Sequence, residues 1–312
     1  MTHLLAIDWG TSSLRGALIT ENGSVSDERS FPRGILSVAP GEFAAVFAQC
    51  FGDWMKPGTL CLISGMAGSQ QGWVEAPYCP CPAGFADIAA HLAWIDHAGP
   101  GRIAIVPGLS IDAGGSPDVM RGEETQVFGA LAQLDLLDAV IVLPGTHSKW
   151  VTVQARRITH FSTWMTGEFY ALLRQHSILS RTLPAAATAH EPAAFEQGVA
   201  RALSGEGLLH TAFSTRTLAL FKRMEPPALA SYLSGLVIGE ELRGQTLARG
   251  SEVVIVGAPE LSARYEQALG LIGVACRSPA SNATWAGLRA IADTLGPSTR
   301  LKRIVSRYKI RT

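Results

Sequence analysis

A carboxylate and a turn of small residues stand together near the start of the chain, in the segment Asp8-Trp9-Gly10-Thr11-Ser12. The turn offers backbone N–H groups and two hydroxyls, and a concave set of such donors suits the oxygens of a triphosphate. Mg²⁺ binds through one or two carboxylates, waters and phosphate oxygens, so Asp8 alone suffices to hold it through a water molecule. The alternative interpretation is an ordinary hairpin turn that follows an acidic residue.

The pattern occurs again 135 residues later, as Gly145-Thr146-His147-Ser148. Apolar and β-branched runs predict strands around both copies, at 4–8, 14–20 and 25–31 and then at 141–143, 150–153 and 158–164. An internal repeat of this length indicates a duplicated fold and makes a chance hairpin a poor explanation. We therefore expect phosphate contacts from Gly10, Thr11 and Ser12 in the first copy and from Gly145, Thr146 and His147 in the second.

The elements that must position these turns follow a similar order in each half. After the first copy we expect a helix at 41–51, a strand at 60–64, an irregular Gly/Gln stretch, a strand at 103–106 and a helix at 123–134. After the second we expect helices at 169–175, 195–202, 208–224, 228–247, 261–271 and 285–295, with strands at 253–256 and 274–276. This order predicts an α/β protein with domains at 1–137 and 138–312 and a ligand cleft between them.

Composition restricts the partners of the chain. With 26 basic and 26 acidic residues among 312, it has no overall field that would attract nucleic acid. The 47% of apolar residues predict a globular core, and small molecules are the expected partners. Six basic residues between Arg300 and Arg311 are interpreted as a solvated tail, with a phosphate or nucleic-acid patch as the alternative. A homodimer is compatible with the sequence, which does not fix the oligomeric state.

Cysteine usage and hydropathy indicate a cytoplasmic location. The five cysteines are an odd number, and their spacing does not match a zinc site, so we expect reduced thiols. The first residues run directly into an apolar strand without the pattern of a signal peptide. No apolar run approaches the ~20 residues of a membrane span, so we expect no membrane insertion.

Three motifs resemble those of the sugar kinase, actin and Hsp70 superfamily: Asp8-X-Gly10-Thr11-Ser12, Gly145-Thr146 and Ile255-Val256-Gly257-Ala258. In that superfamily they are the first phosphate, second phosphate and adenosine motifs. The resemblance implies an actin-like (ribonuclease H-like) duplicated ATPase fold, with Gly257 and Ala258 against the adenosine. A plain strand-to-helix turn is the alternative for these two residues.

Four further blocks resemble the 2-dehydro-3-deoxygalactonokinase family. They are Ser64-Gly65-Met66-Ala67-Gly68-Ser69-Gln70-Gln71-Gly72-Trp73, Met120-Arg121-Gly122-Glu123-Glu124-Thr125-Gln126, Leu143 to Trp150, and Trp164-Met165-Thr166-Gly167-Glu168. The resemblance implies a kinase that uses ATP and Mg²⁺ to phosphorylate the 6-hydroxyl of 2-dehydro-3-deoxy-D-galactonate in galactonate catabolism. The second phosphate motif departs from the superfamily, because Leu143-Pro144 stands where an Asp is usual. Asp8 is then the only metal-side carboxylate, and Lys149 and His147 are expected to contact phosphates.

A kinase also needs a group that accepts the proton of the attacking hydroxyl. The candidates are four acids before or at the start of the predicted helix 123–134, namely Asp112, Asp118, Glu123 and Glu124. Asp118 and Glu124 are favoured and are not separated by the sequence. The alternative for Glu123 and Glu124 is a carboxylate that complements the helix dipole. The alternative for Asp118 is a turn or cap residue.

The acceptor is expected to be a small acid with several hydroxyls, which calls for a guanidinium and polar amides. The candidates are Arg121, Gln70, Gln71 and Ser110, with Trp73 as a wall beneath the sugar. For Arg121 a surface ion pair with the following glutamates is an equal alternative.

Two other functions use the same phosphate turns. An exopolyphosphatase-like hydrolase would place water where the sugar binds, and a nucleotide-binding regulator would lack the proton acceptor. The Gly68–Trp73 segment and Arg121 argue against the hydrolase, and the four acids argue against the regulator.

Overall fold

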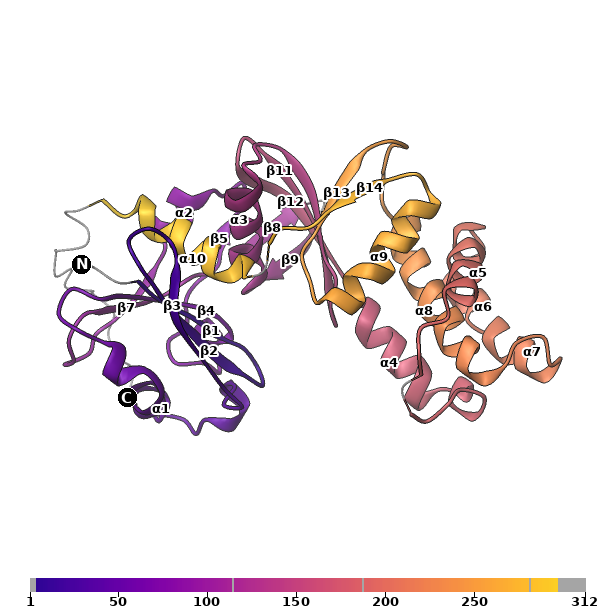
Figure 1. The fold of residues 1–312 in the computed structure, drawn as a ribbon, viewed down its shortest axis with the longest axis horizontal. Helices are drawn as coiled ribbons and strands as arrows, with labels where there is room; N and C mark the ends of the chain where they lie inside the picture. Colours follow the sequence, from indigo (N-terminus) through magenta and orange to yellow (C-terminus); the bar gives the residue numbers. More distant parts are fainter. Residues whose placement is uncertain (1–3, 114, 187, 281, 297–312) are drawn as a thin grey trace. The chain divides into compact units, whose positions relative to one another are not determined.

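The computed structural model describes residues 4–113, 115–186, 188–280 and 282–296, which form two units (Figure 1). The first unit contains the described residues within Met1–Asp138, Thr152–Phe161 and Pro279–Thr312. The second contains Ala139–Val151 and Ser162–Ser278. The basic stretch 300–311 lies outside the described residues.

A six-stranded sheet organises the first unit, in the order β3-β2-β1-β4-β7-β6. Its strands are β1 (Leu4–Trp9), β2 (Leu14–Ile19), β3 (Val25–Phe31), β4 (Leu60–Gly65), β6 (Ala93–Ile95) and β7 (Arg102–Ile105). The first three strands form the predicted antiparallel meander, and β4 pairs in parallel with β1. Alternate β1 side chains, including Leu5, Ile7 and Trp9, pack in one core with Phe47 and Phe51 of helix α1 (Phe43–Phe51). This packing fixes the end of β1, where Asp8 lies.

A second, smaller sheet in the first unit was not predicted. The order is β5-β8-β9, from β5 (Cys79–Pro80), β8 (Leu109–Ala113) and β9 (Ser116–Met120). The stretch predicted to be irregular also contains helix α2 (Phe85–Ala90) and strand β6, so that prediction was wrong. These elements are two to six residues long and rich in Gly, Pro and Ser at their borders, which leaves too little hydrophobic periodicity for detection.

The third sheet has five strands, in the order β12-β11-β10-β13-β14. Its strands are β10 (Ala139–Leu143), β11 (Ser148–Gln154), β12 (Arg157–Trp164), β13 (Glu252–Ile255) and β14 (Ala275–Arg277). Strand β13 pairs in parallel with both β10 and β14. In chain order this is the same 3-2-1-4-5 arrangement as β3-β2-β1-β4-β7, which confirms the predicted duplication.

Helices α4 to α9 all belong to the second unit. They are α4 (Thr166–His176), α5 (Pro192–Leu203), α6 (Leu208–Thr211), α7 (Ser214–Leu220), α8 (Pro226–Arg243) and α9 (Pro259–Leu271). The single helix predicted at 208–224 is divided at Ala212-Phe213 into α6 and α7, and α7 ends at Leu220. Helices α5 and α8 approach closely at Gly198 and Gly235, where a Cβ would meet the backbone of the other helix.

The last described helix, α10 (Ala283–Thr294), belongs to the first unit, whereas the sequence placed 138–312 in one domain. Helix α10 packs on α3 (Glu123–Leu134) at Gly129 and Gly287. A Cβ on Gly129 would lie 1.7 Å from the carbonyl oxygen of Ala283, so this contact admits glycine alone. The hydrophobic periodicity predicted the helix but carries no information on which core it joins.

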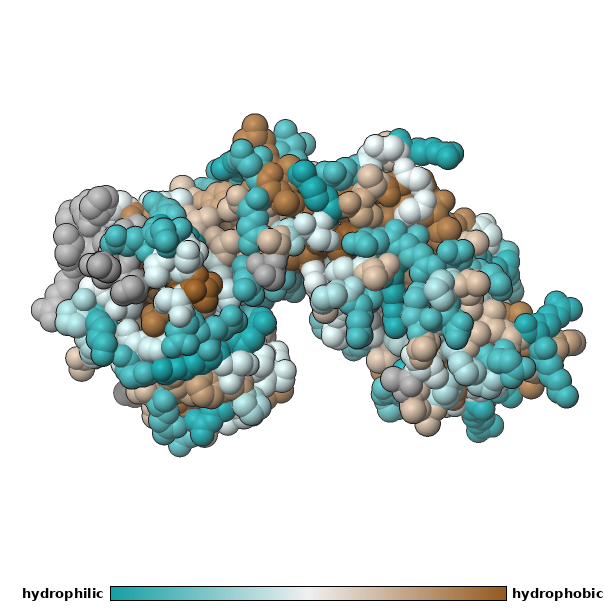
Figure 2. Space-filling model, viewed as in Figure 1, coloured by the Kyte–Doolittle hydropathy of each residue, from teal (hydrophilic) through white to brown (hydrophobic). Residues whose placement is uncertain are grey.

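Hydrophilic residues cover most of the visible surface of the second unit's helices, and hydrophobic residues show between them in small groups (Figure 2). Exposed apolar side chains in α6, in α7 and just after it include Leu209, Leu220 and Phe221. Among the described residues, no helix combines the length and the apolar character that crossing a membrane requires.

Candidate active site

The first phosphate turn follows β1 and is closed by a second segment of the first unit. Within the turn, the Gly10 N–H donates to the Ser13 carbonyl at 2.9 Å. A Cβ on Gly34 would lie 2.2 Å from both the Thr11 oxygen and the Ser12 nitrogen, so Gly34 covers this peptide directly. The side chains of Thr11 and Ser12 are exposed. The turn is therefore held by its backbone and leaves its hydroxyls available to a ligand.

Asp8 is paired with an arginine that the sequence reasoning missed. The Arg15 guanidinium lies 2.5 Å from Asp8 Oδ2, and the side chains are 46% and 20% exposed respectively. The two residues are directly opposite on β1 and β2. A signal for this pair was present, because a hairpin with a turn at 10–13 places positions 8 and 15 across from each other. The pair puts one negative and one positive group beside the turn.

Glu124 lies at the start of α3 and is joined to the Asp8 region through two glycines. Gly65 and Gly122 have φ values of 93° and 106°, which favour glycine, and a Cβ on Gly122 would lie 3.4 Å from Gly65 Cα. A Cβ on Gly65 would in turn lie 3.3 Å from Asp8 Oδ1. The Gly122 N–H donates to Glu124 Oε2 at 2.7 Å. The structure thus brings Asp8 and Glu124, two of the predicted catalytic residues, into one region of the first unit.

The carboxyl of Glu124 is fully buried, and burial raises its pKa to about 8, with the neighbouring Glu123 adding to the rise. The hydroxyl of Thr125 donates to Glu124 Oε1 at 3.0 Å and lies 2.9 Å from the Ser64 hydroxyl. A carboxyl with this pKa binds a proton far more readily than an exposed glutamate does. Such a group suits proton transfer near neutral pH.

The other three acids occupy different settings. Asp118 is partly exposed on β9, opposite Ile111 of β8, and accepts from the Val119 N–H at 2.7 Å. Asp112 is exposed on β8. These two lie in strands of a hairpin, so the interpretation of Asp118 as a turn or cap residue is wrong. Glu123 accepts from the Arg121 N–H at 3.0 Å.

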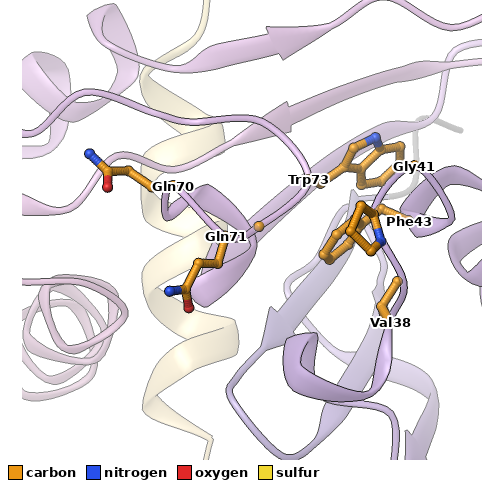
Figure 3. Close-up of a pocket in the computed structure, with 8 residues that line it drawn as sticks. Val38, Gly41, Phe43, Gln70, Gln71 and Trp73 are labelled. Atoms are coloured by element: carbon orange, nitrogen blue, oxygen red, sulfur yellow. The ribbon is translucent and has the colours of Figure 1, made fainter.

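A pocket of about 440 Å³ opens beside the Gly/Gln stretch in the first unit. It is lined by two segments, Val38, Pro40, Gly41 and Phe43 on one side and Gln70, Gln71, Gly72 and Trp73 on the other. Figure 3 shows the two glutamine side chains apart from the rings of Trp73 and Phe43. The Trp73 ring packs on Trp9 and Phe47, with centroid distances of 6.1 Å and 5.5 Å. The pocket thus combines exposed amides with a fixed aromatic wall.

The guanidinium of Arg121 lies next to the Gly/Gln stretch, and its Nη2 atom is hydrogen-bonded while Nε and Nη1 are not, within the described residues. It stacks on Tyr78, 4.4 Å from the ring centroid, and Nη2 donates to the Ala76 carbonyl at 2.8 Å. Nε and Nη1 are buried and have no hydrogen-bond partner in the described part of the chain. Because a Cβ on Gly68 would lie 2.7 Å from Nη1, Arg121 borders the segment that leads to Gln70. No ion pair joins Arg121 to the adjacent glutamates among the described residues.

Ser110, the remaining predicted acceptor residue, is partly buried on β8, where its carbonyl accepts from the Cys81 N–H at 2.9 Å. It does not line the pocket that contains Gln70, Gln71 and Trp73.

The second phosphate turn is closed in a similar way by the start of α4. A Cβ on Gly167 would lie 2.5 Å from the Gly145 oxygen and 2.8 Å from Thr146 Cα. The Glu168 N–H donates to the Thr146 carbonyl at 3.0 Å, and the Glu168 carboxylate lies 2.5 Å from His147 Nε2. His147 is half exposed, so this contact leaves part of its ring open to solvent. A glycine therefore covers the peptide of each phosphate turn.

Lys149 points away from solvent. It lies on β11 with 6% exposure, and its Nζ donates to the Thr163 hydroxyl at 2.6 Å. In this structure the ammonium group contacts β12. The predicted contact of Lys149 with phosphates therefore stays a prediction.

The adenosine motif follows β13 and lies beside the second phosphate turn within the second unit. The Val256 N–H donates to the Val142 carbonyl at 2.9 Å, which continues the pairing of β13 with β10. A Cβ on Gly257 would lie 3.4 Å from Pro144 Cδ, and both Gly257 and Ala258 are exposed. Since Ala258 caps the N-terminus of α9, an open backbone and a helix start face the same region.

The carboxylates that could hold a metal are few. No group of three or more His, Cys, Asp or Glu side chains with metal-binding geometry occurs among the residues that the structure describes. Mg²⁺ bound to a nucleotide needs no such cage, because phosphate oxygens and water supply most of its ligands. The partly exposed carboxylate of Asp8, at the edge of a turn rich in donors, fits this mode of binding.

Sequence comparisons identify the relatives of this chain. The family model described as 2-keto-3-deoxy-galactonokinase matches residues 8–291. A probable 2-dehydro-3-deoxygalactonokinase of Rhizobium meliloti (strain 1021) is 38% identical over 301 residues, which cover 95% of this chain and 98% of the relative. The 2-dehydro-3-deoxygalactonokinase of Escherichia coli (strain K12) is 34% identical over 294 residues, which cover 93% and 98% of the two chains.

The solved structures include a Sinorhizobium meliloti protein with the same kinase description. It matches this structure with a TM-score of 0.85 at 36% identity and covers 95% of this chain and 100% of its own. This likeness, together with the repeated strand order, confirms the actin-like duplicated α/β fold. Since the matched range extends from Asp8 past both phosphate turns and the adenosine motif, the chain belongs to the 2-keto-3-deoxy-galactonokinase family.

Proposed function

We propose that this protein is a cytoplasmic, ATP-dependent kinase that phosphorylates the 6-hydroxyl of 2-dehydro-3-deoxy-D-galactonate in galactonate catabolism. The observation that carries the proposal is the pair of glycine-covered phosphate turns in a chain of this family, with Asp8 two residues before the first turn and Leu143 at the matching position before the second. Fixed backbone donors and one metal-side carboxylate are what phosphoryl transfer requires of the protein.

Nucleotide binding is assigned to residues of each unit. In the first unit, the Gly10-Thr11-Ser12 turn would bind phosphate oxygens, with donors from Thr11 and Ser12, and Asp8 would hold Mg²⁺ through water. In the second, Gly145, Thr146 and His147 would donate to phosphates, with Gly257 and Ala258 against the adenosine. Mg²⁺, when bound, neutralises charge on the phosphates of the nucleotide. Arg15 is an additional candidate for a phosphate contact, because its guanidinium is half exposed beside the same turn.

For the proton acceptor we favour Glu124. Its buried carboxyl has a pKa raised to about 8 by desolvation, and two glycines separate it from Asp8. Asp118, on an exposed hairpin, remains the second candidate.

The sugar acid is assigned to the pocket of Gln70, Gln71 and Trp73. Its volume of about 440 Å³ is adequate for a six-carbon acid, and its amides suit several hydroxyls. Arg121 is assigned to the carboxylate of the substrate, because two of its N–H-bearing atoms are buried without a partner. An organic acceptor accounts for these residues, whereas a hydrolase that uses water does not need them.

The test is ADP release by the purified protein with Mg-ATP and one of several acceptors: the galactonate-derived acid, its gluconate epimer, simple hexoses or none. We expect turnover with the galactonate-derived acid and little ADP release without an acceptor. Asp8→Asn should lower kcat by roughly a hundredfold or more, because the metal-side carboxylate is lost. The matched control is Asp27→Asn, which changes an exposed carboxylate on β3 and should keep wild-type turnover.

Acceptor-independent ADP release would instead support the exopolyphosphatase-like hydrolase. Nucleotide binding without any turnover would support the regulator.

A further inference from the structure

The buried carboxyl of Glu241 is the centre of a hydrogen-bond network in the second unit. Glu241 lies on α8 and is 1% exposed. Trp150 Nε1 donates to its Oε1 at 2.6 Å, and the Tyr265 hydroxyl donates to its Oε2 at 2.7 Å. The hydroxyl of Thr166 also donates to Oε2. The three donors come from β11, α9 and α4, so one carboxyl joins four elements.

Two residues of this network flank the second phosphate turn. Ser148 begins β11 directly after the turn, and its hydroxyl lies 2.9 Å from that of Tyr265. Because the Tyr265 hydroxyl donates to Glu241, the Ser148 hydroxyl donates to Tyr265. Thr166 is the first residue of α4 and immediately precedes Gly167, which covers the turn. Glu241 therefore anchors the chain on both sides of the turn.

The same carboxyl is connected to the adenosine motif. Tyr265 is buried on α9, the helix that begins at Pro259 immediately after Gly257 and Ala258. The residues proposed to contact phosphates and adenosine in this unit therefore lie close in sequence to side chains that are hydrogen-bonded, directly or through Tyr265, to the Glu241 carboxyl. None of the motif resemblances includes Glu241.

Burying the Glu241 carboxyl costs desolvation free energy, and a stable core can be formed without a buried carboxyl. Burial raises the pKa of Glu241, and the hydrogen bonds from Thr166, Tyr265 and Trp150 oppose that rise. Apolar residues of similar volume often stabilise a core as well as or better than buried charged groups do. Three donors on one carboxyl instead fix the directions of their elements, because each hydrogen bond weakens when its geometry changes.

We propose that Glu241 is a positioning residue for the nucleotide, which holds the start of α4, the start of β11 and α9 in the arrangement that binds phosphates and adenosine. This inference rests on the proposed function, since it assumes that the Gly145–Thr146 turn binds nucleotide. Glu241 itself would contact neither the nucleotide nor the acceptor.

The test compares Glu241→Leu, Glu241→Gln and Thr166→Val by calorimetric Kd for Mg-ADP, by KM for ATP and for the acceptor, and by Tm. We expect Glu241→Leu to weaken Mg-ADP binding by roughly ten- to a hundredfold and to leave the acceptor KM within about threefold. Glu241→Gln should restore most of the affinity, because its amide still accepts from Trp150. Thr166→Val keeps the shape of the side chain and should give a smaller loss, so it serves if Glu241→Leu does not fold.

The matched control is Ser231→Ala, which removes another buried polar group of α8, one that accepts from the Glu191 N–H. It should lower Tm without changing the Kd for Mg-ADP. Thr166→Val and either Glu241 variant could likewise lower Tm and leave the Kd for Mg-ADP unchanged. In that case Glu241 has only a structural role and the inference is overturned. A wild-type protein that binds no Mg-ADP would instead remove the proposed function itself.

Discussion

Two buried glutamates, one in each unit, differ in how their hydrogen bonds are arranged. Glu124 accepts mainly from backbone N–H groups and from one hydroxyl, whereas Glu241 accepts from three side chains. Desolvation is the largest cause of the raised pKa in both. With its pKa raised to about 8, Glu124 takes up a proton readily, as its proposed role requires.

The pH dependence of Glu124 provides a prediction. The folded-state pKa, about 8, is above the ordinary value of 4.5, so this group stabilises the fold fully below pH 4.5 and that stability is lost as the pH rises through about 8. Catalysis needs the ionised form, so kcat/KM should rise with pH up to about 8 and then level off. Glu124→Gln should remove this dependence from both unfolding and rate profiles and lower kcat by roughly 10²- to 10⁴-fold.

Two neighbours serve as comparisons for Glu124. Glu123→Gln alters the adjacent carboxylate and should keep most of the rate. If Asp118→Asn loses kcat and Glu124→Gln does not, Asp118 is the proton acceptor. Urea unfolding between pH 5 and 9, together with rate profiles over the same range, distinguishes these outcomes.

Arg121 provides a second prediction at this scale. Removing a guanidinium that binds a carboxylate should cost roughly ten- to a hundredfold in affinity for the acid. We therefore expect Arg121→Ala to raise the KM for the sugar acid by this factor and to leave the KM for ATP nearly unchanged. An acceptor without a carboxylate should show no such difference between wild type and variant in steady-state kinetics.

The comparison for Arg121 is Arg102→Ala in the same unit, because Arg102 also stacks on an aromatic ring, 3.7 Å from the centroid of Trp94. Equal increases in both KM values for Arg121→Ala would assign it a structural role.

Among the structural elements, the two phosphate turns are each closed by a glycine from a different kind of segment. Gly34 lies in a loop just before a short 3₁₀ helix, and Gly167 lies in the first turn of α4. In both places the turn peptide is close enough to exclude a Cβ. The position of each turn therefore depends on a backbone contact rather than on a side chain.

This contact leads to a prediction for Gly167→Ala. A Cβ there would lie 2.5 Å from the Gly145 oxygen, so the turn must move, even though alanine favours a helix by roughly 1 kcal/mol over glycine. We expect the KM for ATP to rise at least tenfold, as measured by steady-state kinetics. Gly270→Ala in α9, where a Cβ meets nothing within 4 Å, should leave kinetics unchanged and raise Tm slightly.

The elements also show what the sequence could and could not predict. Strands β1 to β4 and helix α3 were placed within two residues, because strong apolar runs and turn residues border them. Strands β5, β8 and β9 were missed, since their short runs mix Pro, Ser and Asp with apolar residues. The Asp8–Arg15 pair was available from hairpin register. Glu241 was not, because the meeting of α8 with Thr166, Trp150 and Tyr265 depends on tertiary packing.

For the whole molecule, the internal repeat predicted the fold more reliably than any single element. The sheet that contains β1 and the sheet that contains β10 share the 3-2-1-4-5 strand order, and each carries a Gly-Thr turn after its first strand. The two copies differ in their side chains. Asp8 lies two residues before the first Gly-Thr turn, and the apolar Leu143 lies at the matching position before the second. Spacing identifies such a repeat, and side-chain type shows how its two halves have diverged.

The return of α10 to the first unit bears on how the protein is synthesised. Helix α10 packs on α3 and donates from Arg289 to the carbonyls of Thr20 and Glu21 in the β2–β3 turn. The whole second unit lies between α3 and α10 in the sequence. A nascent chain emerging from the ribosome therefore presents α3 with its glycine surface uncovered until residues 283–294 appear. We expect the second unit to complete its fold first, although its synthesis begins later.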